Sequence, residues 1–183
     1  KKTYGYVSAA YFDTANPPSE RIDFISTGGS ANELNNFYVT VGDVTYDKST
    51  LVVLNMRNAK ITGGGKNRDG NDASYPYNIL SDSKNLEYLY LNLNTSSIGQ
   101  SAFYECTSLK KLTIGKGVTF ISEYAFYKAN LLDTIDWNAL NVDDFGSQNN
   151  IFSYAGSGTT TGITLTFGDD VEKIPAYAFN PYN

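Results

Sequence analysis

Apolar residues recur along this chain in a short pattern, in which two of them are three positions apart and a third follows after one intervening residue. The three clearest copies are Leu86-x-x-Leu89-x-Leu91, Leu109-x-x-Leu112-x-Ile114 and Leu132-x-x-Ile135-x-Trp137. The step from Leu89 to Leu112 and the step from Leu112 to Ile135 are both 23 residues. Because a β-strand sends alternate side chains to opposite faces, the end of each copy is predicted to be a short strand with one buried face.

Two weaker copies flank these three. Leu51-x-x-Leu54-x-Met56 precedes them, and Gly162-x-x-Leu165-x-Phe167 follows them without an apolar residue at its first position. Their middle residues lie 35 and 30 residues from the nearest regular copy. The longer spacings predict irregular insertions between units, which we place at residues 57–85 and 138–162.

A second apolar motif accompanies the first at a fixed distance. Its copies are Ile98-Gly-Gln-Ser-Ala102-Phe103, Ile121-Ser-Glu-Tyr-Ala125-Phe126 and Ile174-Pro-Ala-Tyr-Ala178-Phe179. The isoleucine follows the strand residue by nine positions from Leu112 to Ile121, and again from Leu165 to Ile174. Apolar residues four and five positions apart suit one face of a short helix or a 3₁₀ turn.

The two motifs together predict a solenoid. Neither half of the unit buries its apolar side chains alone, whereas stacked copies share one continuous core and contact only their neighbours. The strands should be parallel, because every copy runs in the same direction before the chain crosses back. The predicted fold class is an α/β solenoid, with a short-stranded parallel sheet on one face and short helical or 3₁₀ turns on the other.

The residues from Ile98 to Ile114 carry a family resemblance. The phrase Ile98-Gly-Gln-Ser-Ala-Phe-Tyr-Glu-Cys106-Thr-Ser-Leu109-Lys-Lys-Leu-Thr-Ile114 closely resembles the repeat of BspA-like leucine-rich-repeat proteins, in which Ile-Gly, Ala-Phe, Cys and Ser-Leu form the running unit. The resemblance covers residues 49–183 and is most specific over residues 98–137. Cys106 matches the family's cysteine position, and we expect it to be a small buried residue.

The domain boundaries follow from where the repeat is found. Residues 1–48 are expected to form an N-terminal non-repeat or capping segment, and residues 49–183 one continuous leucine-rich-repeat solenoid. Within the first segment, residues 37–41 alternate with period two and are predicted to form a strand. Leu34-x-x-Phe37-x-Val39 echoes the repeat, which makes this segment a candidate capping unit that starts the sheet. The chain ends before the strand that should follow its last Ala-Phe pair, as in a segment cut from a longer protein.

Composition narrows the function classes. The net charge is −5 without clustered Lys or Arg, which disfavours a nucleic-acid partner. The chain has no histidine, which removes histidine-activated nucleophiles, histidine general bases and histidine metal ligands together. No segment approaches the roughly 18 consecutive apolar residues of a transmembrane helix. The acid pairs Asp143-Asp144 and Asp169-Asp170 adjoin Gly or Asn, so we interpret them as turn residues rather than as paired catalytic carboxylates.

Residues 63–72 are rich in glycine and charge but match no ligand-binding motif. In a phosphate-binding loop Lys66 would be followed by Ser or Thr, whereas Asn67 follows it here. Asp69 and Asp72 lack the glutamate that completes a calcium-binding loop. We interpret the segment as a solvated loop, and we expect no catalytic residue, no metal site and no cofactor in the chain.

The residues between the core positions of each strand form the candidate binding site. In a stacked sheet they project from one exposed face, where Tyr, Asn, Thr and Arg provide rigid aromatic area and adaptable hydrogen bonding. The predicted partner-binding residues are Asn55, Arg57, Tyr88, Tyr90, Asn92, Lys111, Thr113, Thr134, Asp136 and Asn138. The alternative interpretation is that these β-forming residues only cover the sheet.

The resemblance implies a function that the spacing alone does not. BspA-like proteins are often bacterial surface proteins that attach to host proteins or to other cells. By resemblance, the chain is expected to be a non-enzymatic binding module at the cell surface or outside the cell, with a protein or glycan ligand such as host extracellular matrix. One alternative is a structural spacer or cap in a larger surface protein. Another is a glycan-cleaving enzyme, which would need convergent carboxylates in a cleft.

Overall fold

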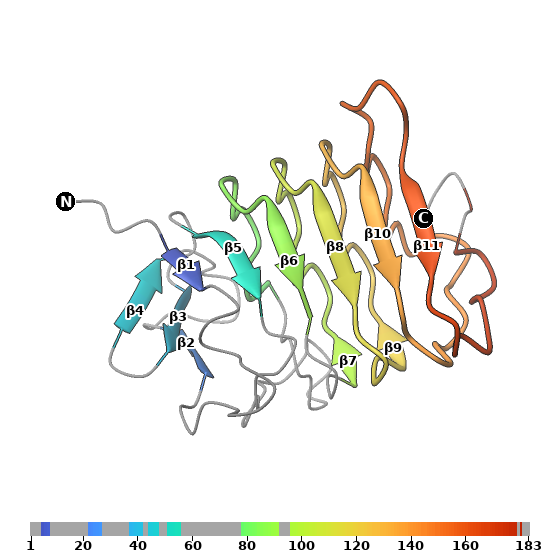
Figure 1. The fold of residues 1–183 in the computed structure, drawn as a ribbon, viewed down its shortest axis with the longest axis horizontal. Coiled ribbons are helices and arrows are strands. Elements are labelled where there is room, and N and C mark those ends of the chain that lie inside the picture. The colour runs from blue at the N-terminus through green and yellow to red at the C-terminus, as the bar shows by residue number, and fades with distance from the viewer. Residues whose placement is uncertain are drawn as a thin grey trace.

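The computed structural model describes residues 5–7, 22–26, 37–41, 44–47, 51–55, 78–91, 96–178 and 180. In the repeat region the chain winds as a solenoid, with strands side by side along one face and return segments along the other (Figure 1). The glycine-rich residues 63–72 lie outside the described residues. The solenoid itself is the architecture that the paired motifs predict.

Six parallel strands form the main sheet. In sheet order they are β1 (Gly5–Val7), β5 (Leu51–Asn55), β6 (Tyr88–Tyr90), β8 (Lys111–Ile114), β10 (Thr134–Trp137) and β11 (Thr164–Phe167). Every neighbouring pair is parallel. The five strands predicted from the apolar pattern are therefore confirmed, and so is their parallel arrangement.

The register of the sheet keeps equivalent repeat positions in one line. The middle apolar residues form a continuous row across five strands, Leu54, Leu89, Leu112, Ile135 and Leu165. The first four of these side chains are at most 6% exposed. Burying one such side chain stabilises a fold by about 1.5–3 kcal/mol relative to leaving it in water, so this row is a main source of stability.

The opposite side of the solenoid consists of return turns, each with two non-glycine residues of positive φ four positions apart. The pairs are Asn78 and Asp82, Ser101 and Glu105, Tyr124 and Lys128, and Asn150 and Tyr154. A right-handed helix cannot continue through a left-handed residue, so each of these segments remains a turn. The described residues contain no helix, and the predicted helical or 3₁₀ face is therefore not confirmed.

Backbone hydrogen bonds connect each return turn to the next. The first set runs from the N–H groups of Asn78, Leu80 and Asp82 to the carbonyl oxygens of Gln100, Ala102 and Tyr104 at 2.7–3.1 Å. The same pattern joins residues 101–105 to residues 123–127, and residues 124–128 to residues 149–153. The turn side is thus hydrogen-bonded along the solenoid axis in the same way as the sheet.

The prediction of irregular insertions is wrong for part of each segment. Residues 78–82 and 150–154 are return turns with the same paired positive φ as the regular copies. In these two copies the Ala-Phe pair is replaced by Ile79-Leu80 and by Ile151-Phe152. Other apolar residues occupy the same positions, and all but the partly buried Phe152 are buried, so the repeat continues where its consensus residues do not.

The isoleucines of the second motif lie between the sheet and the turns. Ile98 and Ile121 belong to two short strands, β7 (Ser97–Ile98) and β9 (Phe120–Ile121), which pair in parallel. Both isoleucine side chains are at most 2% exposed. In these two copies the second motif therefore starts with a strand residue and continues into the turn, whereas Ile174 of the third copy is 50% exposed and lies outside the strands.

Aromatic rings run through the core at the return turns. Phe103 stacks on Phe126, and Phe126 stacks on Phe152, with centroids 5.3 Å apart in both pairs. Cys106 is fully buried; its N–H donates to the carbonyl oxygen of Phe103, and its Sγ donates a hydrogen bond to the carbonyl oxygen of Leu80 at 3.3 Å. Cys106 is therefore the small buried residue that the sequence predicts.

A separate antiparallel sheet contains the predicted strand at residues 37–41. It consists of β2 (Ile22–Ser26), β3 (Phe37–Val41) and β4 (Val44–Asp47) in that order. The strand prediction is confirmed, but residues 37–41 do not start the repeat sheet, because β1, which lies earlier in the predicted N-terminal segment, occupies that end. Only two residues separate β3 from β4, and so short a connection joins antiparallel strands.

Candidate interaction surface

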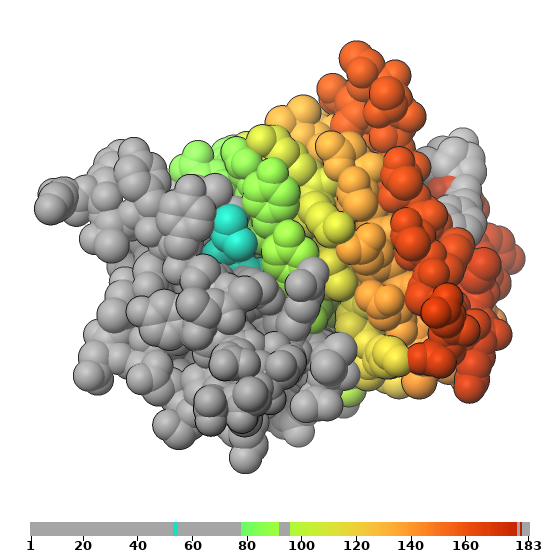
Figure 2. Space-filling model, in the orientation of Figure 1, coloured from blue at the N-terminus to red at the C-terminus, as the bar shows by residue number. Residues whose placement is uncertain are grey.

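The side chains between the core positions lie in two rows across the sheet. The first row contains Val53, Tyr88, Lys111, Thr134 and Thr164, and the second contains Tyr90, Thr113, Asp136 and Thr166, with the backbone of Asn55 in register at its end. We call these two rows the sheet face. In the space-filling view, β6, β8, β10 and β11 appear as adjoining bands from green through yellow and orange to red (Figure 2). The register therefore brings together residues that are far apart in the sequence.

Exposure varies along the sheet face. Tyr88, Tyr90 and Lys111 are half-buried, as are Thr134 and Asp136, because each is flanked by neighbours from adjacent strands. Thr113 corrects the prediction that every residue in these rows is available for contact, since it is only 7% exposed. Its short side chain lies in register between Tyr90 and Asp136, which are both larger.

An ion pair lies at the centre of the sheet face. Lys111 Nζ is 2.8 Å from the same Asp136 carboxylate oxygen, Oδ2, that accepts a hydrogen bond from Thr113 Oγ1 at 3.4 Å. The Lys111 and Asp136 side chains keep 32% and 28% of their surface exposed. A partly solvated pair of this kind stabilises a fold by no more than about 1 kcal/mol. Its charges remain near enough to the surface to contact a partner.

The remaining predicted residues lie at the margins of the sheet face or beyond the described part. Asn55 ends β5 opposite Tyr90. Asn138 follows β10 directly, and its N–H donates to the carbonyl oxygen of Ile114 at 3.0 Å. Arg57 and Asn92 lie outside the described residues.

A small polar hollow lies beside Asn138, at the ends of the strands. Its volume is about 270 Å³, and it is lined by Lys116, Asn138, Gly168, Asp169 and Asp170. Lys116 forms an ion pair with Asp170, and this hydrogen bond lowers the pKa of the Asp170 carboxyl. The hollow therefore combines a neutralised ion pair with an additional acid, Asp169.

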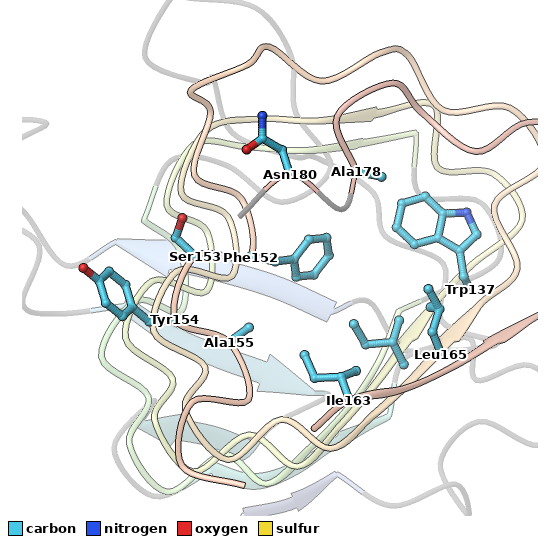
Figure 3. Close-up of a pocket in the computed structure, with 10 residues that line it drawn as sticks. Trp137, Phe152, Ser153, Tyr154, Ala155, Ile163, Leu165, Ala178 and Asn180 are labelled. Atoms are coloured by element: carbon cyan, nitrogen blue, oxygen red, sulfur yellow. The ribbon is translucent and has the colours of Figure 1, made fainter. Parts of the chain in front are cut away.

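An apolar cavity of about 370 Å³ lies at the C-terminal end of the solenoid. Figure 3 shows Trp137 and Leu165 on the sheet side of this space, with Ile163 beside Leu165 and with Phe152 facing them from the return turn. Its polar contributors are Ser153 and Asn180. The cavity falls within the usual size range of ligand pockets.

A cluster of tyrosines on the return turns was not identified from the sequence. Tyr104 and Tyr127 stack with centroids 5.1 Å apart, and Tyr124 and Tyr154 meet Tyr127 edge-on at 5.6 and 5.5 Å. Lys128 Nζ lies 5.3 Å from the Tyr127 ring centroid. The 23-residue step between Tyr104 and Tyr127 indicated that the two residues are equivalent in consecutive repeats. It did not indicate which surface of the solenoid carries their side chains.

An ion pair lies beside this tyrosine cluster. Lys128 pairs with Glu105 at 2.8 Å, and the hydrogen bond lowers the pKa of Glu105 and raises the pKa of Lys128. Partial burial, with the neighbouring Glu105 charge, raises the pKa of Tyr104. Tyr104 is therefore neutral and Glu105 and Lys128 are charged at neutral pH.

The comparison with family models decides which class of repeat this is. The model described as "BspA type Leucine rich repeat region" matches residues 74–183 with six copies, which is more than half of the chain. The chain belongs to the BspA-type leucine-rich-repeat family. The match begins close to Asn78, the first of the return turns with paired positive φ, so it includes both copies that lack the Ala-Phe pair.

Leucine-rich repeats of the BspA type are in general non-enzymatic interaction modules. Two of the four paired acids, Asp144 and Asp170, form ion pairs with lysines. Asp144 accepts a hydrogen bond from the Ala176 N–H at 2.9 Å, which together with Lys173 lowers the pKa of its carboxyl. Among the described residues of this BspA-type repeat, no group of three or more Cys, Asp or Glu residues is arranged to hold a metal ion.

No characterised protein and no solved structure shows significant similarity to this BspA-type chain. Where the structure is described, it contains no helix long and apolar enough to cross a bilayer. The family assignment therefore rests on the repeat itself, and a particular ligand has to be argued from the surfaces.

Proposed function

We propose that this chain is a non-enzymatic binding module of a bacterial cell-surface or secreted protein, and that it recognises a protein or glycan partner through the sheet face. The observation that carries the proposal is the register of the sheet, which sets Tyr88 and Tyr90 beside Lys111 and Asp136 in two continuous rows. The bacterial origin and the surface location rest on membership of the BspA-type family.

The composition of the sheet face suits recognition. Tyr88 and Tyr90 supply aromatic area with few rotatable bonds, which lowers the entropy cost of ordering them on binding. Thr134, Thr164 and Asp136 supply hydrogen-bonding groups beside them. The backbones of β6 and β10, which carry Tyr88, Tyr90, Thr134 and Asp136, are held by parallel strands on both sides, so these side chains are presented from a rigid support.

A structural spacer is the second candidate, and one observation favours it. Lys111 and Asp136, the two charged residues at the centre of the sheet face, already pair with each other. A partner that contacts either charge would weaken this ion pair, and the new contacts would have to offset that loss. In the spacer interpretation the sheet face is only a cover for the core, and ligand binding belongs to other parts of a larger surface protein.

The test is a binding screen of the purified chain against extracellular-matrix proteins and glycans, with a Tyr88→Ala/Tyr90→Ala variant measured in parallel. Both tyrosines are half-buried and outward-facing, so the variant should remain folded, which far-ultraviolet circular dichroism and thermal unfolding would verify. Saturable binding that the variant loses supports the sheet face. An absence of binding across the screen favours the spacer.

A further inference from the structure

Thr113 is the short residue in the second row of the sheet face, and longer side chains stand on both sides of it. Its register partners are Tyr90 in β6 and Asp136 in β10. Neighbouring strands lie about 4.8 Å apart, so Tyr90 and Asp136 are separated by about 10 Å across the row. Both of these side chains are half-buried, whereas Thr113 is buried. The row is therefore lowest at Thr113, with an aromatic ring on one side and a carboxylate on the other.

The carboxylate of Asp136 is only partly used by its neighbours. Lys111 Nζ at 2.8 Å and Thr113 Oγ1 at 3.4 Å both contact one oxygen, Oδ2. The second oxygen, Oδ1, has no hydrogen-bond or ion-pair partner among the residues that the structure describes. An ionised carboxylate accepts hydrogen bonds on both oxygens, and the Asp136 side chain is partly exposed. Asp136 can therefore accept a further donor while it stays paired with Lys111.

The groups on the two sides of Thr113 favour a cation. The face of an aromatic ring attracts positive charge within about 6 Å of its centroid, and a carboxylate binds charged donors at about 2.8 Å. These two distances together nearly match the separation of Tyr90 and Asp136, so one cation placed above Thr113 contacts both. The chain also carries a net charge of −5, which attracts a basic partner over longer distances.

A guanidinium suits this position better than an ammonium. It is planar, so one of its faces can stack on the Tyr90 ring while its edge donates N–H groups to Asp136. An ammonium is more strongly hydrated and has no flat face to stack. Arginine is also one of the residues that most often carry the binding energy of protein interfaces. The cation that fits above Thr113 is therefore the side chain of an arginine.

We propose that the sheet face binds a partner protein through an arginine, whose guanidinium lies above Thr113, stacks on Tyr90 and pairs with Oδ1 of Asp136. The proposal rests on the proposed function of the sheet face, and it selects a protein over a glycan as the ligand. Lys111 lowers the affinity of this site, because its positive charge lies beside the arriving guanidinium.

The probe is N-acetyl-arginine amide, titrated into the isotope-labelled full chain while the amide signals of Thr113 and Asp136 are followed by NMR. Saturable shifts of these two signals are expected, with roughly millimolar affinity for a single side chain. N-acetyl-citrulline amide has nearly the same shape without the charge, and it should bind about tenfold more weakly. No saturable shift, equal binding of the two probes, or tighter binding of a neutral methyl glucoside at the same amides would overturn the proposal.

Substitutions of the two charged residues should act in opposite directions. Asp136→Asn keeps the size of the side chain and should weaken binding of the arginine probe by about tenfold or more. Lys111→Met removes the neighbouring charge at similar length and should strengthen binding severalfold. Weaker binding in Lys111→Met, or unchanged binding in Asp136→Asn, would contradict an arginine site at this carboxylate.

A steric variant tests the position without a change of charge. Thr113→Leu raises the lowest point of the row and should abolish binding of the arginine probe. Thr164→Leu makes the same change at an exposed position in the first row, and it should leave binding unchanged. Far-ultraviolet circular dichroism would verify that both variants are folded. Equal effects of the two leucines would argue against a site above Thr113.

The titration needs no partner, so its outcome does not depend on the binding screen. For a protein from the screen whose binding is lost in Tyr88→Ala/Tyr90→Ala, Asp136→Asn should also weaken binding. If Asp136→Asn binds that protein as wild type does, the arginine site is wrong and the sheet face remains the binding surface. If Tyr88→Ala/Tyr90→Ala itself binds the protein normally, the proposed function of the sheet face is wrong, and the arginine site loses its basis.

Discussion

The rings of Phe103 and Phe126 stack in the core with centroids 5.3 Å apart and planes inclined by 1°. These residues hold the same position in consecutive repeats, and Phe152 continues the stack at the same distance on the far side of Phe126. Sequence steps of 23 and 26 residues thus give the same ring spacing in the core. Phe126 contacts an aromatic ring on both faces, so the stack depends on it most.

Phe126→Ala should therefore be strongly destabilising. The side chain is fully buried, and its removal leaves a cavity between two aromatic neighbours that the rigid repeats on either side cannot close. We expect a loss of about 3–5 kcal/mol in the free energy of unfolding, measured by urea denaturation. Phe120→Ala is the control, because Phe120 is 42% exposed and should cost far less. Equal losses for the two variants would contradict the stacked core.

Ser101→Gly should stabilise the chain. Ser101 has a φ of 56°, a left-handed conformation that costs a non-glycine residue about 1–2 kcal/mol. Glycine adopts it freely but loses more backbone entropy on folding, so the net gain should be roughly 0.5–1 kcal/mol. Ser122→Gly is the matched control, since the φ of Ser122 is not positive, and it should lower stability. A loss of stability in both variants by thermal unfolding would argue against strained return turns.

The Glu105–Lys128 pair should make stability depend on pH on the acid side. The hydrogen bond from Lys128 holds the pKa of Glu105 below its ordinary value, so the pair contributes fully above the unfolded pKa of about 4.3. The contribution is lost as pH falls through the lower pKa of folded Glu105. Wild type should melt slightly above Glu105→Gln at pH 6, and the difference should vanish at strongly acidic pH. A difference in Tm that persists unchanged in acid would show that the charge is not its source.

The Lys111–Asp136 pair on the sheet face should couple weakly. A double-mutant cycle with Lys111→Ala and Asp136→Ala should give a coupling energy in unfolding below about 1 kcal/mol, because both side chains remain partly solvated. A coupling well above this value would mean that the pair is a structural element of the sheet. In that case neither charge could leave the ion pair to contact a binding partner without a large loss of stability.

The sheet could be predicted from the sequence to the level of individual residues. Leu89, Leu112 and Ile135 align in the structure as their spacing requires, because a strand's period of two and a fixed repeat length leave one register that buries all three. The outward rows followed from the same alternation. The burial of Thr113 did not, since it depends on the sizes of Tyr90 and Asp136 in the neighbouring strands.

The turn side was less predictable, for two physical reasons. Ile79-Leu80 and Ile151-Phe152 fill the position of the Ala-Phe pair with different apolar residues. The segments that join them to the preceding strands are also longer than in the regular copies. The left-handed residues carry no glycine signature, because Ser101 and Tyr124 occupy positions where glycine is the usual choice. The spacing of apolar residues therefore indicated a short helix or 3₁₀ turn, whereas the described backbone forms a turn in which two residues have positive φ.

The most direct test of the account compares the two sides of the solenoid for the partner that the screen identifies. The measurement is the Kd of Tyr88→Ala/Tyr90→Ala and of Tyr124→Ala/Tyr154→Ala, each relative to wild type, by surface plasmon resonance. The account predicts that the sheet-face variant loses about tenfold or more in affinity, while the turn-side variant binds within a factor of about two of wild type. The reverse pattern would contradict it and assign binding to the tyrosine cluster on the return turns.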